Sequence, residues 1–187
     1  MNYKQVYDEI ESMEILSFLY TKEYEYHKQY IRFGRPAKVP RGQASYTFDE
    51  SIHYDYKVAG GSPPNEVMCE TLKKITLDVN KVLNTNYNTI LMNVYKDGKD
   101  CIGGHRDKET GWREETGFAT LSFGSVRNFD IRNDETEILT RIPHKNGWVI
   151  EMPYPMNSTH THAVPSQPRI KEPRISLTFR EIIPNNT

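Results

Sequence analysis

The sequence predicts an α+β fold in which helices precede a jelly-roll core, also called a double-stranded β-helix. Two helix-like segments lie in the first half of the 187-residue chain, and short strand-like runs fill the second half. The length fits one domain with one core. With 36% hydrophobic and 26% charged residues, the composition is typical of a globular rather than a disordered chain. We therefore expect a single domain over residues 1–187.

Both helices are predicted from apolar residues that recur at steps of three or four. In the first twenty residues, the expected buried face consists of Val6, Ile10, Met13, Leu16 and Leu19. In the second helix, from Asn65 to Leu83, it consists of Met68, Leu72, Ile75, Val79 and Val82. Asn65 is the expected N-cap of this second helix, because its side chain can accept a hydrogen bond from a free backbone amide.

From Thr89 onward, short runs of β-forming residues alternate with turn residues. The expected strands are Thr89–Tyr95, Phe118–Phe123, Phe129–Arg132, Ile138–Ile142, Trp148–Met152, Thr159–Val164 and Ile175–Arg180. Antiparallel strands of this number and spacing indicate a sandwich or barrel, and the preceding helices favour the jelly-roll form.

The apolar runs are short and the cysteines are few. Runs such as Ile90 to Met92 are far below the roughly 18 residues that cross a bilayer, and the first residues lack the apolar segment of a signal peptide. Cys69 and Cys101 lack the CxxC spacing of zinc or redox sites, so we expect free thiols. These features predict a soluble intracellular protein. We further expect a monomer, located in the nucleus if the source is a eukaryote and in the cytoplasm otherwise.

Positive charge is concentrated between His27 and Phe48. The chain has a net charge of −1, yet this segment contains no acidic residue and carries Lys28, Arg32, Arg35, Lys38 and Arg41. One local surface with this charge can contact phosphate groups. A solvated positive loop without a ligand is the alternative interpretation.

A candidate metal site begins with the triplet His105-Arg106-Asp107. In an extended segment, residues i and i+2 point to the same side, so both side chains can reach one ion. A histidine on a strand about fifty residues later would complete two histidines and one carboxylate, the ligand set of non-haem iron with open positions. His160 and His162 both qualify, and strand alternation places them on the same face, so spacing does not choose between them.

The triplet also has two other interpretations. A structural zinc site needs four protein ligands, and neither cysteine is placed to help. A simple hydrogen bond between His105 and Asp107 in a loop would need no metal. The segment near the C-terminus argues for a ligand site, because it alternates apolar residues with Arg174, Ser176, Thr178 and Arg180. An exposed strand would also alternate, but inward-facing arginines could bind a dicarboxylate cosubstrate bidentately.

Taken together, these residues resemble the AlkB family of 2-oxoglutarate dioxygenases from about Tyr30 to Ile182. The matching strings are Asn93–Gly98, His105–Asp107, Leu121–Gly124, His162–Pro165 and Pro173–Arg180. Within that family the chain looks most similar to the eukaryotic member that prefers double-stranded DNA, because Arg32–Gly34 and Val39–Ala44 also have counterparts there.

The resemblance implies a site for Fe(II), 2-oxoglutarate and O2. The third iron ligand would be His162, since the family histidine is followed two residues later by a hydrophobic residue and then proline, and His160 would be its neighbour. Arg174 would bind the carboxylate of 2-oxoglutarate that lies far from iron. The other implied cosubstrate residues are Asn93, Tyr95, Ser176, Thr178 and Arg180. One departure concerns Ser176, where family members commonly have asparagine.

By the same resemblance, the protein would oxidise methyl groups on 1-methyladenine and 3-methylcytosine and release them as formaldehyde. The methylated edge lies inside a duplex, so the base must be flipped out. Residues 27–60 would then form a nucleotide-recognition lid, with Phe33 inserted into the base stack. Implied substrate contacts are Phe33, Arg41, Tyr54, Tyr56 and Glu109.

Each of these substrate positions also has an ordinary structural interpretation. Phe33 could be a buried strand-end residue, Tyr54 and Tyr56 could belong to a half-buried strand from Ile52 to Val58, and Glu109 could be a solvated loop residue. Double-stranded DNA is the expected partner, with single-stranded DNA and RNA as alternatives. The competing functions are an RNA demethylase or protein hydroxylase of the same fold, and a non-catalytic jelly roll that binds nucleic acid.

Overall fold

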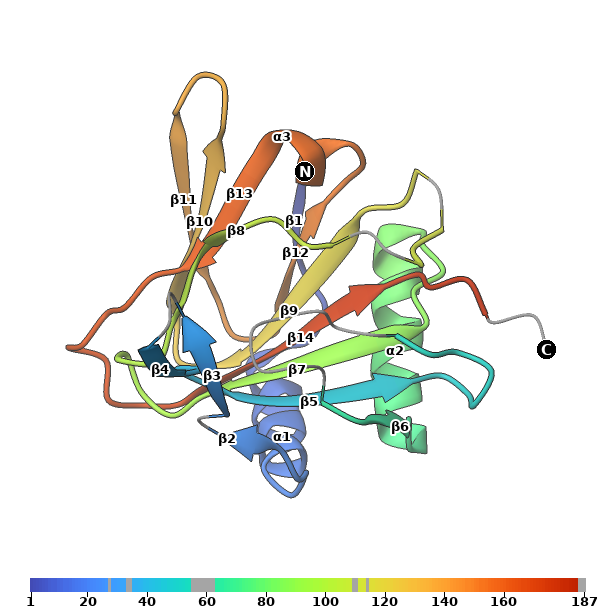
Figure 1. The fold of residues 1–187 in the computed structure, drawn as a ribbon. Coiled ribbons are helices and arrows are strands. Elements are labelled where there is room, and N and C mark those ends of the chain that lie inside the picture. Colours follow the sequence, from blue (N-terminus) through green and yellow to red (C-terminus); the bar gives the residue numbers. More distant parts are fainter. Residues whose placement is uncertain (27, 33–34, 55–62, 109–110, 114, 185–187) are drawn as a thin grey trace.

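A computed structural model describes residues 1–26, 28–32, 35–54, 63–108, 111–113 and 115–184. Two sheets pack face to face, and helices cover the outer face of the larger one (Figure 1). This is an α+β fold with two mainly antiparallel sheets, consistent with the predicted jelly roll. Among the described residues, no helix is long and apolar enough to cross a membrane.

The larger sheet contains eight strands. In spatial order these are β1 (Asn2–Gln5), β12 (Trp148–Met152), β9 (Phe118–Gly124), β14 (Arg174–Arg180), β7 (Thr89–Tyr95), β5 (Gly42–Thr47) and β2 (Glu25–Tyr26), with β6 (Asn65–Val67) paired in parallel to β5. The smaller sheet has the order β11 (Leu139–His144), β10 (Arg127–Asn133), β13 (His160–Val164) and β8 (Ile102–His105). A separate hairpin joins β3 (Gln29–Arg32) to β4 (Arg35–Lys38).

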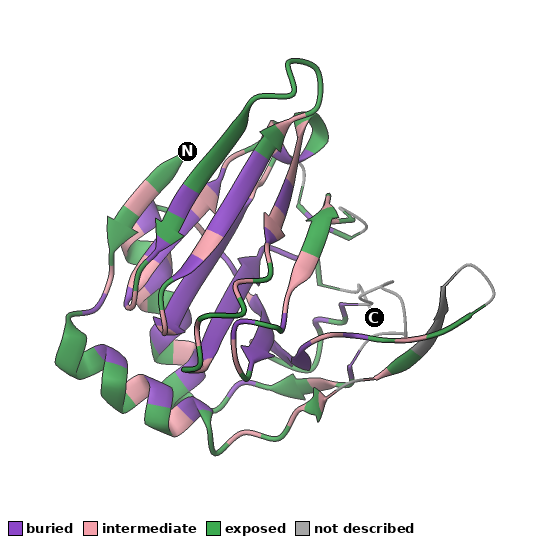
Figure 2. Cartoon of the chain, turned by 90° about the vertical axis from the view of Figure 1, so that its left-hand side faces the viewer, coloured by how far each residue is buried: buried purple, intermediate pink, exposed green. Residues whose placement is uncertain are grey.

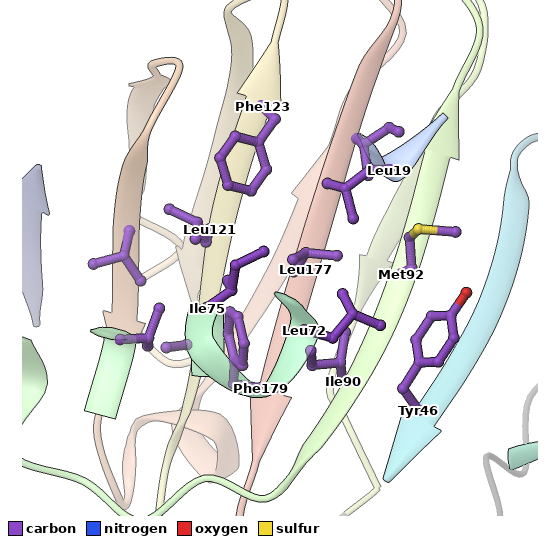
Figure 3. Packing of buried hydrophobic residues seen from close by; sticks show 14 of the residues in the cluster. Leu19, Tyr46, Leu72, Ile75, Ile90, Met92, Leu121, Phe123, Leu177 and Phe179 are labelled. Carbon is purple, nitrogen blue, oxygen red and sulfur yellow. The ribbon is translucent and has the colours of Figure 1, made fainter. Parts of the chain in front are cut away.

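The larger sheet is buried on both faces. On the outer face, side chains of β7, β9 and β14 pack against α1 (Glu9–Leu19) and α2 (Glu70–Leu83), as Figure 3 shows for Leu72, Ile75, Leu177 and Phe179. On the inner face, a second cluster that includes Tyr95, Phe118 and Ile150 meets Phe129 and Val164 of the smaller sheet. Buried residues accordingly run along the central strands in Figure 2. A cavity lies between the two sheets and is lined by residues of both.

All seven predicted strands are present, with bounds within about two residues of the prediction. The predicted alternation of the last strand is also confirmed. Ile175, Leu177 and Phe179 belong to the cluster beneath the helices, whereas Arg174 and Arg180 face the cavity between the sheets.

The predicted buried face of the first helix is confirmed for Leu16 and Leu19 and wrong for Ile10 and Met13, and Val6 lies before the helix. The helix begins at Glu9, after a capping box formed by Asp8 and Glu11, and it buries Ser12, Leu16 and Leu19. Ile10 and Met13 are 73% and 51% exposed. The buried face of the helix has a small residue, Ser12, where Gly147 comes close. A Cβ on Gly147 would lie 2.4 Å from the Ser12 hydroxyl oxygen.

The predicted start of the second helix is also wrong. Its period is confirmed by the buried Leu72, Ile75 and Val79, but the helix begins at Glu70 with Cys69 at the N-cap. Asn65 belongs to β6 instead. Its side chain accepts a hydrogen bond from the Ser45 hydroxyl (2.8 Å) and donates one to the Tyr54 carbonyl (3.1 Å). These tertiary contacts replace the predicted cap.

Candidate metal centre and cosubstrate pocket

The candidate metal centre lies where β8 meets β13. His105 ends β8, and it pairs across the sheet with His162 of β13. Asp107 follows two residues after His105, so its carboxylate points to the same side. The candidate ligand atoms of His105, Asp107 and His162 all lie within 4.8 Å of one another. Two imidazoles and one carboxylate thus converge on one point, which leaves the opposite side open to other ligands.

Both imidazoles direct Nε2 toward the carboxylate. The distances to Asp107 Oδ1 are 3.5 Å from His105 and 3.8 Å from His162. Nδ1 of His105 lies 2.9 Å from the Gly103 carbonyl, which assigns the ring proton to Nδ1 and leaves a lone pair on Nε2 for a metal. The His162 ring packs between Phe118 and Phe129, with centroids 4.9 and 5.6 Å away. Burial lowers the pKa of His162 to about 3, so this ligand is neutral at physiological pH.

The Asp107 carboxylate is held ionised by its surroundings. Burial alone would raise the pKa of this group, but the Arg180 guanidinium and the two histidines outweigh that effect and hold the pKa well below its usual range. Arg180 Nη2 donates to Asp107 Oδ2. One carboxylate oxygen is therefore engaged by arginine, and the other faces the two histidines.

His160, the competing histidine, does not contribute to this cluster. Its Nε2 lies 3.3 Å from the Asn133 amide nitrogen and its Nδ1 lies 2.8 Å from the Thr159 hydroxyl. Of the two histidines that spacing left open, His162 is the one that joins His105 and Asp107.

Asn157 supports the metal centre through the backbone, and the sequence analysis missed it. This residue is 4% exposed and lies on the short helix α3 (Met156–Thr159). Its Oδ1 accepts a hydrogen bond from the Asp107 amide (3.0 Å), and its Nδ2 donates one to the Asp107 carbonyl (2.9 Å). Both peptide groups of the carboxylate ligand are thus fixed by one side chain from a segment fifty residues away.

A cavity of about 190 Å³ adjoins the metal centre. It is lined by every predicted site residue that the structure describes, namely His105, Asp107, His162, Asn93, Tyr95, Arg174, Ser176, Thr178, Arg180, Arg41 and Tyr54. The remaining predicted substrate contacts, Phe33, Tyr56 and Glu109, lie outside the described residues.

Arg174 is a buried cation with unused hydrogen-bonding capacity. It is 1% exposed, and no carboxylate among the described residues contributes to its surroundings. Its Nε donates to the Ser122 hydroxyl (2.8 Å) and its Nη2 lies 3.1 Å from His144 Nδ1. Nη1 is buried and lacks an acceptor within the described part of the chain. Burial lowers the pKa of Arg174 to about 10, so the guanidinium remains charged. An uncompensated buried charge is costly, and a carboxylate ligand in the cavity would compensate it.

Asn93 has its amide orientation set by two neighbours. Arg41 Nε donates to Asn93 Oδ1 (2.8 Å), and Gln43 Nε2 lies 3.4 Å from the same oxygen. The amide nitrogen of Asn93 is therefore the atom left to donate to a ligand. Arg41 is only 7% exposed and lines the cavity, so it does not belong to an exposed basic surface, and its predicted contact with substrate stays a prediction. Arg35 and Lys38 of β4 are exposed, as that surface requires.

A two-sheet fold that carries two histidines, one carboxylate and a buried arginine in one cavity defines a non-haem iron oxygenase that uses a carboxylate cosubstrate. The donor set fits Fe(II), and the free edge of Arg174 fits a carboxylate of 2-oxoglutarate. Residues 2–180 match the 2OG-Fe(II) oxygenase superfamily. The chain belongs to this superfamily and, within it, to the AlkB family.

Several known proteins are similar to this chain. The human DNA oxidative demethylase ALKBH2 is 31% identical over 194 residues, which cover 97% of this chain and 73% of ALKBH2. Human alpha-ketoglutarate-dependent dioxygenase alkB homolog 3 is 28% identical over 131 residues, 65% of this chain and 46% of that protein. The solved structure of OsALKBH1 has a TM-score of 0.64 at 15% identity, covers 96% of this chain and 97% of its own, and shares the fold alone. The predicted enzyme class and cofactors are confirmed.

Proposed function

We propose that this oxygenase removes methyl groups from N-methylated bases in DNA, with 1-methyladenine and 3-methylcytosine as substrates. The observation that carries the proposal is the placement of the metal triad, Arg174 and an aromatic wall around one cavity. The relatives named DNA oxidative demethylase support the choice of DNA. The intact triad and the family membership favour an enzyme over the non-catalytic binding module.

His105, Asp107 and His162 would hold Fe(II), which supplies, with 2-oxoglutarate and O2, the oxidation of a C–H bond. The overall change is balanced: the methyl group gains one oxygen atom of O2, and 2-oxoglutarate gains the other as it becomes succinate and CO2. The C–N bond of the cationic N-hydroxymethyl base then breaks. Its electron pair returns to the base nitrogen, formaldehyde leaves, and the hydroxyl proton passes to water, so that the neutral base is restored.

The protein's own residues bind and orient the reactants. Arg174 would pair with the distal carboxylate of 2-oxoglutarate, and the oriented amide of Asn93 and the Tyr95 hydroxyl would donate to the same molecule. Arg180 donates to Asp107 Oδ2, so that Oδ1 is the carboxylate oxygen that would hold the metal. Leu91, Phe118 and Phe129 line the cavity with apolar surface, which limits the entry of water.

Tyr54 is the described residue best placed to meet a flipped base. Its ring lines the cavity and is 5% exposed. Trp112 Nε1 donates to the Tyr54 hydroxyl (3.3 Å), and that hydroxyl lies 3.4 Å from the Lys108 carbonyl. The Arg180 guanidinium carbon lies 5.5 Å from the centroid of the Tyr54 ring. A ring held at the hydroxyl and at one face offers a fixed stacking surface for a planar base.

The substrate class is tested with a panel of oligonucleotides that carry one 1-methyladenine in duplex DNA, single-stranded DNA or RNA. The protein is incubated with Fe(II), 2-oxoglutarate and O2, and restored adenine is quantified by mass spectrometry, with Asp107→Ala as the inactive control. We expect restoration in DNA, at least as fast in duplex as in single strands. Faster restoration in RNA would identify an RNA demethylase, and turnover without any restored base would overturn the proposal.

The roles of residues 27–60 as a lid and of Phe33 as an inserted side chain belong to the same proposal. If Phe33 fills the gap left by a flipped base, Phe33→Ala should slow repair of duplex DNA much more than repair of single strands, because only the duplex has a stack to open. Equal losses on both substrates with a lower thermal midpoint would instead identify Phe33 as a core residue.

A further inference from the structure

His144 lies behind Arg174 and takes no part in the mechanism described so far. It is the last residue of β11, is fully buried and is not part of the cavity wall. Its two ring nitrogens make different contacts: Nε2 lies 2.9 Å from the Trp148 carbonyl, and Nδ1 lies 3.1 Å from Arg174 Nη2. These contacts allow the tautomer and the protonation state of the ring to be assigned.

The contacts of His144 determine its tautomer. A carbonyl can only accept a hydrogen bond, so Nε2 must carry the ring proton and donate it in a hydrogen bond to the Trp148 carbonyl oxygen. Nδ1 then has the lone pair and accepts a hydrogen bond from the guanidinium. Burial, together with the neighbouring Arg174 charge, lowers the pKa of His144 well below its usual value and outweighs the hydrogen bonds to the Trp148 and Thr120 carbonyls, which favour the protonated ring. The ring is therefore neutral and acts as an acceptor toward Arg174.

Two fixed contacts orient the Arg174 guanidinium. Ser122, on β9, accepts from Nε, and His144, on β11, accepts from Nη2. A planar group held at two of its nitrogens cannot rotate about its own axis. Of its five N–H donors, the pair on Nη1 and the second on Nη2 are left for a ligand. Arg174 lines the cavity, so the edge that remains can bind a carboxylate bidentately.

We infer that His144 is a positioning residue for the cosubstrate, because it holds Arg174 in the orientation that binds the distal carboxylate of 2-oxoglutarate. This inference rests on the proposed assignment of Arg174 to that carboxylate. His144 touches neither cosubstrate nor metal. Its contribution is specificity for a 2-oxo acid that carries a second carboxylate at the far end.

Two substitutions separate the contacts of His144. In His144→Asn, the side-chain oxygen occupies the position of Nδ1, so the acceptor for Arg174 is kept. In His144→Gln, the amide nitrogen occupies the position of Nε2, so the contact to Trp148 is kept and the acceptor for Arg174 is lost. Both variants are loaded with Mn(II), which is redox-inert here, and 2-oxoglutarate binding is measured by titration calorimetry alongside the thermal midpoint.

We expect His144→Gln to raise the Kd for 2-oxoglutarate about tenfold, the effect of one charge-assisted hydrogen bond. His144→Asn should stay within about threefold of the wild type. Binding of 2-oxovalerate, which lacks the distal carboxylate, should be the same in all three proteins. Equal losses for both 2-oxo acids would show a merely structural role, and unchanged 2-oxoglutarate binding in both variants would also overturn the inference.

Arg174→Met distinguishes failure of the inference from failure of the pocket assignment. If Arg174→Met leaves 2-oxoglutarate binding unchanged, the proposed cosubstrate site itself is wrong. A measurement without substitutions covers the case in which the His144 variants do not fold. In the Zn(II)-loaded wild type, addition of 2-oxoglutarate should shift the ¹⁵N resonance of His144 Nδ1, and an unchanged resonance would overturn the inference.

Discussion

At the residue scale, two histidines on the same strand have different surroundings. His162 faces Asp107 and is buried between aromatic rings, whereas His160 contacts Asn133 and Thr159. We expect Asp107→Ala and His162→Ala to abolish turnover and iron binding, because each removes a ligand. His160→Ala should keep most of both. Metal analysis of the three purified variants checks this, and loss of iron from His160→Ala alone would contradict the ligand assignment.

A second residue-scale prediction concerns the contacts between Asn157 and the Asp107 backbone. Removing a group that orients a metal ligand commonly weakens metal binding about 10- to 100-fold. We expect Asn157→Ala to lower Mn(II) affinity by an amount in this range. The matched control is Ser158→Ala on the same helix. The Ser158 hydroxyl donates to the Pro155 carbonyl (2.7 Å), and this variant should bind Mn(II) normally. Wild-type affinity in Asn157→Ala would show that these hydrogen bonds do not position the ligand.

The sequence allowed prediction of site residues that belong to short patterns, such as His105 with Asp107 or the alternating arginines of the last strand. It did not reveal Asn157 or His144. Their partners are a backbone peptide and a guanidinium from distant segments, so no local spacing marks them. The burial of Arg41 was not predicted for a related reason: a run of basic residues shows charge but not which side chain turns inward.

At the element scale, α1 offers a direct test of which face is buried. Leu16 is 8% exposed, whereas Met13 is 51% exposed. We expect Leu16→Ala to lower the free energy of unfolding by about 2–5 kcal/mol, the range for truncation of a buried leucine. Met13→Ala should change it by less than about 0.5 kcal/mol. Urea denaturation of both variants measures these values, and equal costs would mean that the helix is rotated from the orientation described.

The helix and strand patterns differ in how well they predict orientation. The strands from Thr89 onward were predictable because their β-forming runs are separated by clear turn residues. The face of α1 was not, because Ile10 and Met13 fit the helical period while a close contact with Gly147 selects Ser12 for the inside. Asn65 was misjudged because an N-cap preference cannot compete with a strand pairing and two side-chain hydrogen bonds.

At the scale of the whole molecule, the burial of neutral His144 links stability to pH. Its pKa is lowered well below 6.5 in the folded protein, so below pH 6.5 the unfolded chain binds a proton that the folded chain does not. Stability from this group is therefore fully present above pH 6.5 and is lost as the pH falls, by up to about 1.4 kcal/mol per unit.

We accordingly expect the free energy of unfolding of metal-free protein to fall between pH 7 and pH 5.5. His144→Asn should show a smaller slope, since that variant lacks the titrating group while all other histidines are unchanged. Chemical denaturation at several pH values measures both slopes. Identical slopes would mean that His144 titrates normally in the folded state.

The central claim joins the metal triad, the cosubstrate pocket and base demethylation into one reaction, and its stoichiometry tests that link most directly. Duplex DNA with a single 1-methyladenine is incubated with the protein, Fe(II), 2-oxoglutarate and O2, and succinate, formaldehyde and restored adenine are quantified together. We expect formaldehyde and restored adenine in equal amounts, each accompanied by one succinate, and none of the three with Asp107→Ala. Succinate formed without formaldehyde or restored adenine would contradict the claim.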